Sequence, residues 1–263
     1  MNTISPKITI VTATLNNLPG LQLTAASIES QSFRGIEHVV VDGGSSDGTQ
    51  EWLATKSGSI LWISEPDLGI ADAMNKGVSM ASGEWVLVLH SEDTLVSHES
   101  LESAVRRLNT DADVVSYHVE FLKGNQSRIY KSRGFGWYIN FKTTIPHQGA
   151  LARRTLFGKV GAFDTGFTVG MDYDFFLRAH RHGARAVVVD DVLSRMPATG
   201  VSSSLQWGSL RARFREERTI QHKNSLGPLN RLMYSIYWPI YIGYRRMRHA
   251  ALARSSDHVE ESI

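Results

Sequence analysis

Short apolar runs alternate with segments of helical periodicity in the first third of the chain. The apolar runs, rich in β-branched residues, cover positions 8–14, 38–42, 60–64 and 85–90. The intervening segments carry apolar residues at helical spacing, at positions 21–31, 48–56 and 70–81. Strands that alternate with helices form βαβ units, so we predict an α/β fold with a mostly parallel central sheet flanked by helices.

The second half of the chain begins with the strand-like run VVSYHVEF and continues through an aromatic loop, GFGWYINF, to a final apolar run, ARAVVVDDVL. We expect these segments to complete the sheet. Gly227 and Pro228 interrupt the C-terminal region. We therefore expect one domain over residues 1–204 and a basic, aromatic helical segment over residues 205–263.

Composition narrows the classes of protein. The 263 residues are 42% hydrophobic and 21% charged, which is typical of a globular domain. The absence of cysteine excludes a disulfide framework, a thiolate metal site and a cysteine nucleophile, and permits a reducing compartment. The first 17 residues lack the long apolar core and cleavage site of a signal peptide, so we expect a cytoplasmic protein.

Polar residues follow the ends of the predicted strands, where parallel sheets bind ligands. They are Asn16, Asp42, Glu65, Asp67, Glu92 and Asp93. Asp42 precedes Gly43 and Gly44, which let a ligand approach the backbone, and its carboxylate can accept a bond from a base or a ribose hydroxyl. The alternative is a turn whose residues serve geometry alone, and for Ser45, Ser46 and Gly48 both interpretations stand.

Glu92 and Asp93 end the strand at 85–90. Adjacent carboxylates at this edge suit a divalent cation such as Mn²⁺ or Mg²⁺, which binds oxygen ligands and bridges to substrate phosphates. Asp93 is the first choice as metal ligand. The alternative is that the pair caps the helix predicted within SHESLESAVRRL.

Asp172 and Asp174 lie in the helical segment VGMDYDFFLRAHRHG. Arg178 follows Asp174 by one helical turn, so an intrahelical ion pair explains Asp174. That pair leaves Asp172 to face a cleft, where a carboxylate can act as a general base.

His147 follows a proline, and Arg153 lies shortly after it. This basic cluster can contact a phosphate or an acceptor, although a lone histidine is more often structural.

The C-terminal segment combines charge with an apolar run. Residues 205–254 hold ten Lys or Arg against Glu216 and Glu217. The 13 residues between Arg231 and Arg245 rise only about 20 Å as a helix, too little to cross about 30 Å of hydrocarbon. We predict that the segment rests on a membrane surface; a packed C-terminal helix or a dimer contact is the alternative. Because the charge is confined to one end and mixed with apolar residues, no nucleic acid partner is expected.

Together these stretches resemble the inverting glycosyltransferase family 2, in particular bacterial polysaccharide glycosyltransferases of the colanic acid and O-antigen type. The resemblance spans roughly residues 6–204. It rests on six ordered motifs: VDGGSSDGT, SEPDLGIADAMNKG, the strand ending SED, PHQGALARRTLF with GAFD, DYDFFLR, and TGVSS.

The resemblance implies a GT-A fold and an enzyme that moves a sugar, with inversion, from a nucleotide-sugar donor to a growing lipid-linked polysaccharide. A UDP-sugar, a divalent cation and the inner face of the cell membrane are implied with it. The implied nucleotide-sugar pocket contains Thr14, Asn16, Asp42, Glu65, Asp67, Asn75, Lys76 and Glu92. Asp93 matches the metal-binding aspartate and Asp172 the catalytic base, while His147, Arg153 and Arg178 are candidates for phosphate or acceptor contacts.

Three departures from the family pattern bear on the donor and metal sites. Leu15 replaces a tyrosine, Leu68 and Ala71 replace a lysine and a tyrosine, and the HSED sequence at 90–93 replaces Asn-x-Asp-Asp. They motivate a second hypothesis, a catalytically silent protein that binds nucleotide sugars or other partners.

Overall fold

The computed structural model describes residues 7–108, 111–197 and 206–260, with side chains up to residue 249. The chain divides into two compact units, residues 1–200 and 201–263, and each is described by itself. The predicted boundary at residue 205 and the whole TGVSS motif fall in residues 198–205, outside the described part of the chain.

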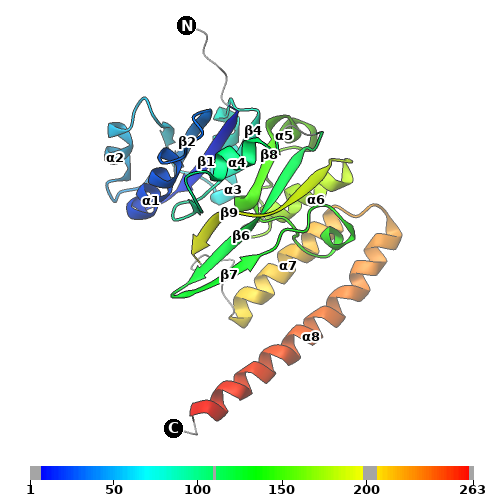
Figure 1. The fold of residues 1–263 in the computed structure, drawn as a ribbon. Helices are drawn as coiled ribbons and strands as arrows, with labels where there is room; N and C mark the ends of the chain where they lie inside the picture. The colour runs from blue at the N-terminus through cyan, green and yellow to red at the C-terminus, as the bar shows by residue number, and fades with distance from the viewer. Residues whose placement is uncertain (1–6, 109–110, 198–205, 261–263) are drawn as a thin grey trace. The chain divides into compact units, whose positions relative to one another are not determined.

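The first half of the first unit alternates strands with helices, as predicted (Figure 1). Its elements are β1 (Ile8–Thr14), α1 (Leu18–Glu29), β2 (Ile36–Asp42), α2 (Thr49–Thr55), β3 (Leu61–Ser64), α3 (Ile70–Met80) and β4 (Trp85–Val88). The four strands pair in parallel, in the order β3-β2-β1-β4. The prediction of parallel βαβ units is therefore confirmed for this half.

The second half of the unit extends the same sheet. Its elements are β5 (Thr94–Leu95), α4 (Ser100–Val105), β6 (Val114–Lys123), β7 (Gln126–Tyr130), the 3₁₀ turns η1 (Trp137–Asn140) and η2 (His147–Gly149), β8 (Ala150–Arg153), α5 (Arg154–Val160), α6 (Met171–Arg181) and β9 (Ala186–Pro197). The sheet order is β3-β2-β1-β4-β8-β6-β9-β5, and β7 pairs with β6.

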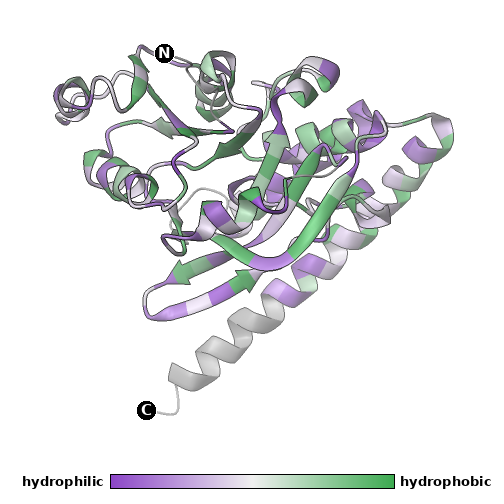
Figure 2. Ribbon diagram, turned by 45° about the horizontal axis from the view of Figure 1, so that its top comes forward, coloured by the Kyte–Doolittle hydropathy of each residue, from purple (hydrophilic) through white to green (hydrophobic). Residues whose placement is uncertain are grey.

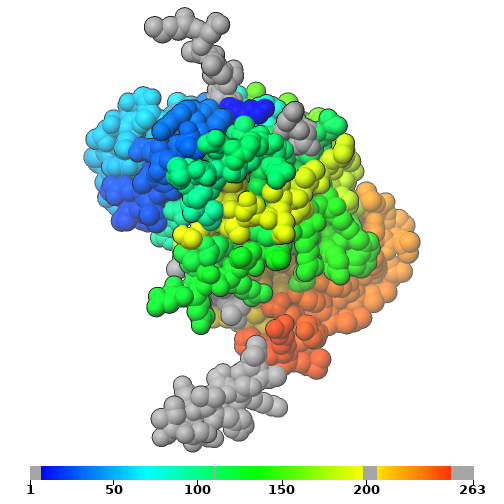
Figure 3. All heavy atoms as spheres, in the orientation of Figure 1, coloured from blue at the N-terminus to red at the C-terminus, as the bar shows by residue number. Residues whose placement is uncertain are grey.

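The sheet as a whole is mixed. Strand β8 lies between β4 and β6 and runs antiparallel to both, whereas β6 and β9 pair in parallel. The α/β fold class is confirmed, and the antiparallel strands are confined to the half that follows β4. The first half of β9 is exposed, with Val187 and Val188 at 39% and 38% of full exposure, and its yellow atoms lie on the face seen in Figure 3.

The core lies along the central strands, which Figure 2 shows mostly in the green of hydrophobic residues. Every residue of β1 and β4 is buried, so both faces of these strands are covered by other elements. Helix α3 packs closely on β1 at Gly77, where an added Cβ would lie 2.2 Å from Val11 Cγ1. A glycine at this position thus sets the distance between helix and sheet.

The second unit contains two long helices, α7 (Trp207–Lys223) and α8 (Pro228–Glu260). They pack through aromatic rings: Phe214 of α7 lies 5.4 Å from Tyr241 and 6.0 Å from Trp238, measured between ring centroids. The indole N–H of Trp238 donates a 2.7 Å hydrogen bond to Gln221 Oε1. The helical character predicted for the C-terminal segment is present, and we call these two elements the C-terminal helical pair.

Candidate functional site

The candidate site lies at the carboxyl edge of the parallel strands. The backbone register aligns Thr14 of β1 with Asp42 of β2, and Asp42 with Ser64 of β3. The loops after β1, β2 and β3 therefore start side by side. The predicted residues in these loops share one edge of the sheet, as expected for an α/β ligand site.

Asp42 is fully buried and organises the loop after β2. Its Oδ2 accepts hydrogen bonds from the Ser45 amide, at 3.0 Å, and from the Ser64 hydroxyl, at 2.6 Å, while Oδ1 accepts a bond from the Ser45 hydroxyl. The carboxylate thus shapes the turn that follows it. Contact between Asp42 and a nucleobase stays a prediction.

The loop after β1 is tied to the loop after β2 through Asn16. The backbone amide of Asn16 donates to the Ser45 hydroxyl at 2.7 Å. The side-chain oxygen Oδ1 of Asn16 accepts from the backbone amide of Ser46 at 2.9 Å. Beside Asn16, the hydroxyl of Thr14 is buried and has no hydrogen-bond partner among the described residues. An unsatisfied buried hydroxyl at a ligand edge is a group that a bound molecule can satisfy.

Gly43 leaves its backbone open to Asp67. A Cβ added at Gly43 would lie 2.7 Å from Asp67 Oδ2 and 3.3 Å from a methyl carbon of Leu15. The other carboxylate oxygen of Asp67 accepts a 2.8 Å bond from the Gly69 amide. Leu15 and Leu68, which replace polar or aromatic residues of the family pattern, are 55% and 84% exposed. Apolar side chains therefore border this part of the site.

Lys76 joins helix α3 to the loop after β3. Its Nζ lies 2.8 Å from Glu65 Oε1 and 3.4 Å from Asp72 Oδ2, and it donates to the Pro66 carbonyl at 3.0 Å. The hydrogen bond to Glu65, with smaller effects of Asp72, raises the pKa of Lys76 above its ordinary value. All three ammonium protons are thus used within the protein.

Two non-glycine residues among those described adopt a left-handed backbone, and both flank this edge. Asn16 has φ 48° and Glu92 has φ 79°. Such conformations cost of order 1–3 kcal/mol for a non-glycine residue and concentrate at functional sites. The side chain of Glu92 does not share the hydrogen-bond partners of Asp93. It accepts a 3.1 Å bond from Asn17 Nδ2, at the start of α1.

Asp93 is buried in the loop between β4 and β5. Its Oδ2 accepts a 2.9 Å bond from the His90 amide, which closes a tight turn, and the helix that follows starts only at Ser100. The pair therefore does not cap that helix, which was the alternative. Burial raises the pKa of Asp93 to about 7, against smaller opposing effects of His147, the His90 amide and the Gln148 side chain.

His147 connects Asp172 to the part of the site that contains His90 and Asp93. Its Nδ1 lies 3.2 Å from Asp172 Oδ2, and its ring meets the ring of His90 edge-on, with centroids 5.0 Å apart. Burial lowers the pKa of His90 to about 3, so this neighbouring ring is neutral. The Gln148 side chain, next to His147, bonds Asp93, and His147 itself acts electrostatically on Asp93. The two carboxylates predicted as metal ligand and base therefore both lie near the turn η2.

Asp172 occupies the first turn of α6. Its Oδ1 accepts a 2.7 Å bond from the Tyr173 amide. Asp174, two residues on, is fully buried and pairs with Arg178 at 2.8 Å. The predicted intrahelical pair is therefore present, and Asp172 is the aspartate that faces the site.

Arg178 and Asn75 hold the loop between α5 and α6 in place. The guanidinium of Arg178 also donates to the carbonyls of Val160, Gly161 and Ala162. The amide of Asn75 both donates to the Phe163 carbonyl and accepts from the Phe163 amide, each at 2.8 Å. The structure engages both predicted site residues with backbone groups, and their proposed ligand contacts stay predictions.

Arg153 is not brought to the other site residues. It pairs with Trp85, the first residue of β4, whereas Asp93 follows the far end of that strand. Its guanidinium lies 4.4 Å from the Trp85 ring and donates to Glu84 Oε1 at 2.6 Å. The sequence separation from His147 is small, but β8 runs antiparallel to β4 and carries Arg153 to the opposite edge of the sheet.

Ser64, His90 and Gln148 belong to the site although sequence reasoning gave them no role, and Ser45, for which turn geometry was one of two interpretations, bonds Asp42 in the turn after β2. The sequence offered a signal for two of these residues. Ser64 is the last residue of β3, and His90 lies two residues before Glu92. Nothing in the sequence indicated that Gln148 would reach Asp93.

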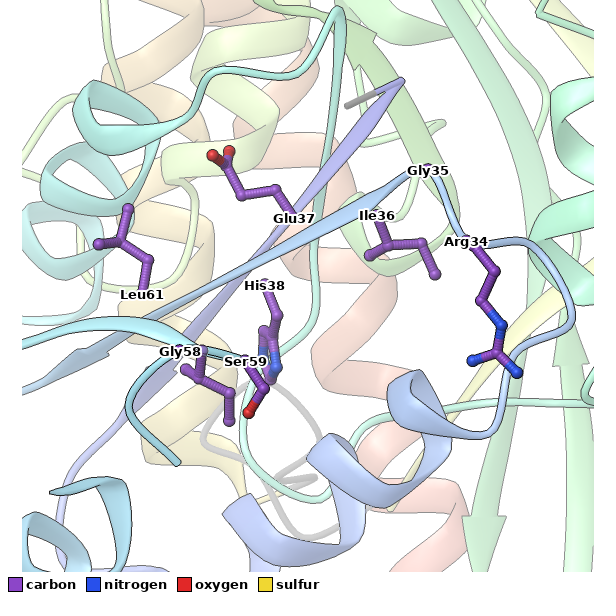
Figure 4. A pocket seen from close by; sticks show the side chains of 9 residues that line it. Arg34, Gly35, Ile36, Glu37, His38, Gly58, Ser59 and Leu61 are labelled. Atoms are coloured by element: carbon purple, nitrogen blue, oxygen red, sulfur yellow. The ribbon is translucent and has the colours of Figure 1, made fainter. Parts of the chain in front are cut away.

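A cavity of about 440 Å³ lies apart from this site (Figure 4). Its lining includes the starts of β2 and β3, among them Glu37, His38 and Leu61. The carboxylate of Glu37 is held by Ser82 and Thr9, and burial lowers the pKa of His38 to about 4. The cavity thus lies at the amino edge of the strands, away from Asp42 and Asp93.

The C-terminal helical pair presents a separate surface. Six large apolar side chains of α8 are more than half exposed: Leu229, Leu232, Ile236, Ile240, Tyr244 and Met247. Their spacing of three or four residues places them on one face of the helix, which we call the α8 stripe. Within the described residues, no helix combines the length and apolar character needed to cross a bilayer.

Comparison with known proteins identifies the family. Residues 9–175 match the family model described as "Glycosyl transferase family 2". It is 34% identical over 220 residues to an uncharacterized glycosyltransferase of Mycobacterium tuberculosis (strain H37Rv), a match that covers 80% of this chain and 83% of the relative. A PGL/p-HBAD biosynthesis glycosyltransferase of Mycobacterium bovis (strain BCG) is 32% identical over 193 residues, with 68% of this chain and 72% of the relative covered.

Solved structures share the fold. S. aureus TarS superposes with a TM-score of 0.65 at 18% identity, over 81% of this chain but only 39% of TarS. The mannosyltransferase PcManGT from Pyrobaculum calidifontis, in complex with GDP-Man and Mn²⁺, gives a TM-score of 0.64 at 21% identity, over 97% of this chain and 76% of that chain. The GT-A fold is thus confirmed, and with the sequence matches it shows that the chain belongs to glycosyl transferase family 2 and is a glycosyltransferase.

Proposed function

We propose that the protein transfers a sugar from a nucleotide-sugar donor to a hydroxyl group of an acceptor, with inversion at the anomeric carbon and Asp172 as the general base. One observation carries the proposal. Asp93 after β4 and Asp172 at the start of α6, far apart in the sequence, both interact with the turn η2: Asp172 contacts His147, and Asp93 accepts a bond from the Gln148 side chain. A donor-side carboxylate and an acceptor-side carboxylate at one place are what this reaction requires.

Each bond that forms or breaks in the proposed transfer can be named. Asp172 removes the proton of the acceptor hydroxyl while the acceptor oxygen forms a bond to the anomeric carbon. The bond from that carbon to the diphosphate oxygen breaks, and the nucleoside diphosphate leaves with the electron pair. Attack from the face opposite the leaving group inverts the configuration. Asp172 ends the step protonated.

The donor pocket is assigned to the loops after β1, β2 and β3. The open backbone at Gly43, the carboxylate of Asp67 and the unsatisfied hydroxyl of Thr14 support this assignment. We favour a UDP-sugar. The related fold of TarS has been determined in complex with UDP-GlcNAc, and that of PcManGT with GDP-Man, so a donor panel must include both nucleotides.

A divalent cation fits the Asp93 site. Burial raises the pKa of this carboxyl group, and a bound cation would supply the positive charge that the ionised form lacks. Among the described residues no three His, Asp or Glu side chains converge as a ready metal cage, so Asp93 would hold Mn²⁺ or Mg²⁺ together with phosphate and water oxygens. The ion would stabilise negative charge on the departing diphosphate.

We extend the proposal to a lipid-linked acceptor of a surface polysaccharide or glycolipid, reached at the inner face of the cell membrane. The α8 stripe supports this, because an exposed apolar helix face is the feature by which interfacial helices enter a bilayer surface. Arg246 and Arg248 flank Met247 on α8, and arginines attract the anionic lipids of the cytoplasmic leaflet. Association would be peripheral.

The test is a donor panel of UDP-, GDP- and dTDP-sugars with Mn²⁺ or Mg²⁺ and a lipid extract that supplies acceptors. We expect one donor to be turned over, and the Asp172→Asn variant to lose about two to four powers of ten in rate while it still binds that donor. Asp111→Asn, at a carboxyl group that is 94% exposed, is the matched control. Tight nucleotide binding without turnover of any donor would instead establish the silent nucleotide-binding protein.

A further inference from the structure

His147 and Asp172 form a contact that the transfer reaction, as described above, does not yet use. The two side chains are 14% and 17% exposed, and the Nδ1 to Oδ2 distance is 3.2 Å. The second oxygen of Asp172 accepts from the amide of its own neighbour, Tyr173. Each oxygen of the carboxylate therefore has one protein partner, which fixes the plane of the group.

The direction of the hydrogen bond follows from the chemistry of the two groups. An ionised carboxylate offers only acceptors, so the shared proton belongs to His147 Nδ1. In the neutral imidazole the other nitrogen, Nε2, then carries no proton. Nε2 is buried and has no hydrogen-bond partner among the described residues. The arrangement therefore favours the Nδ1–H form, in which the single proton is bound to Asp172.

The imidazole itself is held from several sides. Pro146 precedes it, and the turn η2 leads directly into β8. The backbone carbonyl of Gln148 accepts a 2.6 Å bond from the Ser194 hydroxyl of β9. The neutral ring of His90 packs edge-on against the imidazole. A ring fixed in this way can impose one orientation on its hydrogen-bond partner.

We propose that His147 is a positioning residue for the catalytic base: its Nδ1–H holds Asp172 Oδ2 so that the remaining lone pairs of the carboxylate face the acceptor hydroxyl. This inference rests on the proposed function. It replaces the phosphate contact expected for His147, because Nδ1 is already engaged with a carboxylate. Without His147, the Asp172 carboxylate loses one of its two hydrogen-bond partners and keeps the Tyr173 amide.

Three substitutions separate the hydrogen bond from the bulk of the ring. His147→Asn places an amide N–H near the position of Nδ1, His147→Gln places it farther along the side chain, and His147→Leu removes the donor. We expect His147→Asn to keep kcat within about threefold and His147→Leu to lose about 10- to 100-fold, with His147→Gln between them. The KM for the acceptor and the Kd for the donor should change by less than about threefold, because neither substrate is bound by this proton.

Two controls make the result specific. His98→Leu changes a histidine whose side chain is 67% exposed and outside the site, and it should match the wild type. In the Asp172→Asn background, His147→Leu should cause almost no further loss, because residues that act through each other are not additive. A full additional loss in the double variant would show that His147 acts independently of the base and would overturn the inference.

A measurement that needs no turnover guards against misfolded variants. ¹⁵N NMR of histidine-labelled wild-type protein should show His147 as the Nδ1–H tautomer, and Asp172→Asn should shift that signal. A protonated Nε2 with a bare Nδ1 contradicts the proposed bond. Wild-type transfer that is lost in Asp172→Asn but unchanged in His147→Leu would sink the inference and leave the function intact. If the wild type turns over no donor, the proposed function fails and so does the catalytic role of His147, while the spectra still report whether it donates to Asp172.

Discussion

The side-chain amide of Asn75 on α3 forms two hydrogen bonds with the backbone of Phe163, one to its carbonyl and one from its amide, each 2.8 Å long. This paired contact links the half of the sheet with the proposed donor loops to the loop that precedes α6. It joins residues that are 88 positions apart in the sequence. Asn75, predicted from the sequence as a ligand contact, therefore also has a structural role in the fold.

Replacing Asn75 tests that role. Asn75→Ala removes two partly buried hydrogen bonds, each worth about 1 kcal/mol, so the free energy of unfolding should fall by about 2 kcal/mol. Urea denaturation measures the change, and Asn125→Ala, in the exposed turn between β6 and β7, should have no effect. A variant with unchanged stability and weakened donor binding would return Asn75 to the donor pocket.

Gly43→Ala should weaken donor binding without unfolding the protein. The new methyl carbon would lie 2.7 Å from Asp67 Oδ2, so the tip of that side chain must move, and Asp67 is also held by the Gly69 amide. We expect donor affinity, measured by calorimetry, to fall about tenfold, or about 1.4 kcal/mol. Gly158→Ala, where an added Cβ meets nothing within 4 Å, is the control. Equal affinities in both variants would remove Gly43 from the donor pocket.

Asp93 should make the apoprotein less stable as pH rises. Burial raises its folded pKa to about 7, from an ordinary value of 3.8, so between these values the folded state binds a proton that the unfolded state does not. Stability from this group is therefore present at low pH, is lost as pH rises toward 7 and stays constant above it. Asp93→Asn lacks the titration, so its stability relative to the wild type should increase from pH 4 to pH 7. Urea denaturation across this range, without metal, should show that trend; a constant difference would contradict the buried carboxyl group.

His38 and His90 predict the opposite slope on the acid side. Burial lowers their folded pKa values to about 4 and about 3, below the ordinary value of 6.5. The unfolded state therefore takes up protons first, and stability falls as pH drops below about 6.5. His90→Gln should reduce this acid sensitivity when thermal unfolding is followed from pH 7 to pH 4. His98→Gln, at an exposed position, should leave the slope unchanged.

The α8 stripe predicts binding to anionic membranes. Ile240→Glu places a charge in the centre of the stripe, so co-flotation with vesicles that contain anionic phospholipid should fall at least tenfold. Ile129→Glu, at a half-exposed apolar residue of β7, is the matched control and should float like the wild type. If the wild type and the Ile129→Glu control both fail to float, and Ile240→Glu instead abolishes self-association in sedimentation experiments, the stripe is a contact between two copies of the chain.

The fold was predictable where single segments determine their own structure. Strands β1, β2, β3 and β4 are runs of β-branched and apolar residues, with β1 and β4 buried throughout, and their predicted ranges lie close to the observed ones. The position of β8 between β4 and β6 was not predictable, because a four-residue strand carries no signal for the partner it will pair with or for its direction.

The site residues, like the fold, were predictable only where a local pattern determines their structure. The separation of Asp172 from Asp174 followed from helical spacing, which a local pattern contains. The contacts of Asn75 with Phe163 and of Arg153 with Trp85 depend on chain segments brought together only by folding. Backbone carbonyls leave no mark in a sequence, so residues that bind them look like candidates for a ligand.

The antiparallel course of β8 has a consequence for how proteins of this design can diversify. The turn that carries His147 lies where β8 begins, next to the end of β4. The pairing of these two short strands therefore joins the half of the sheet with the proposed donor loops to the half that follows it. The β6–β7 hairpin and the turn η1 lie outside the four parallel strands, so we expect changes in their length or sequence to leave the proposed donor pocket intact. We therefore expect acceptor preference to change in this part of the chain while donor preference is kept.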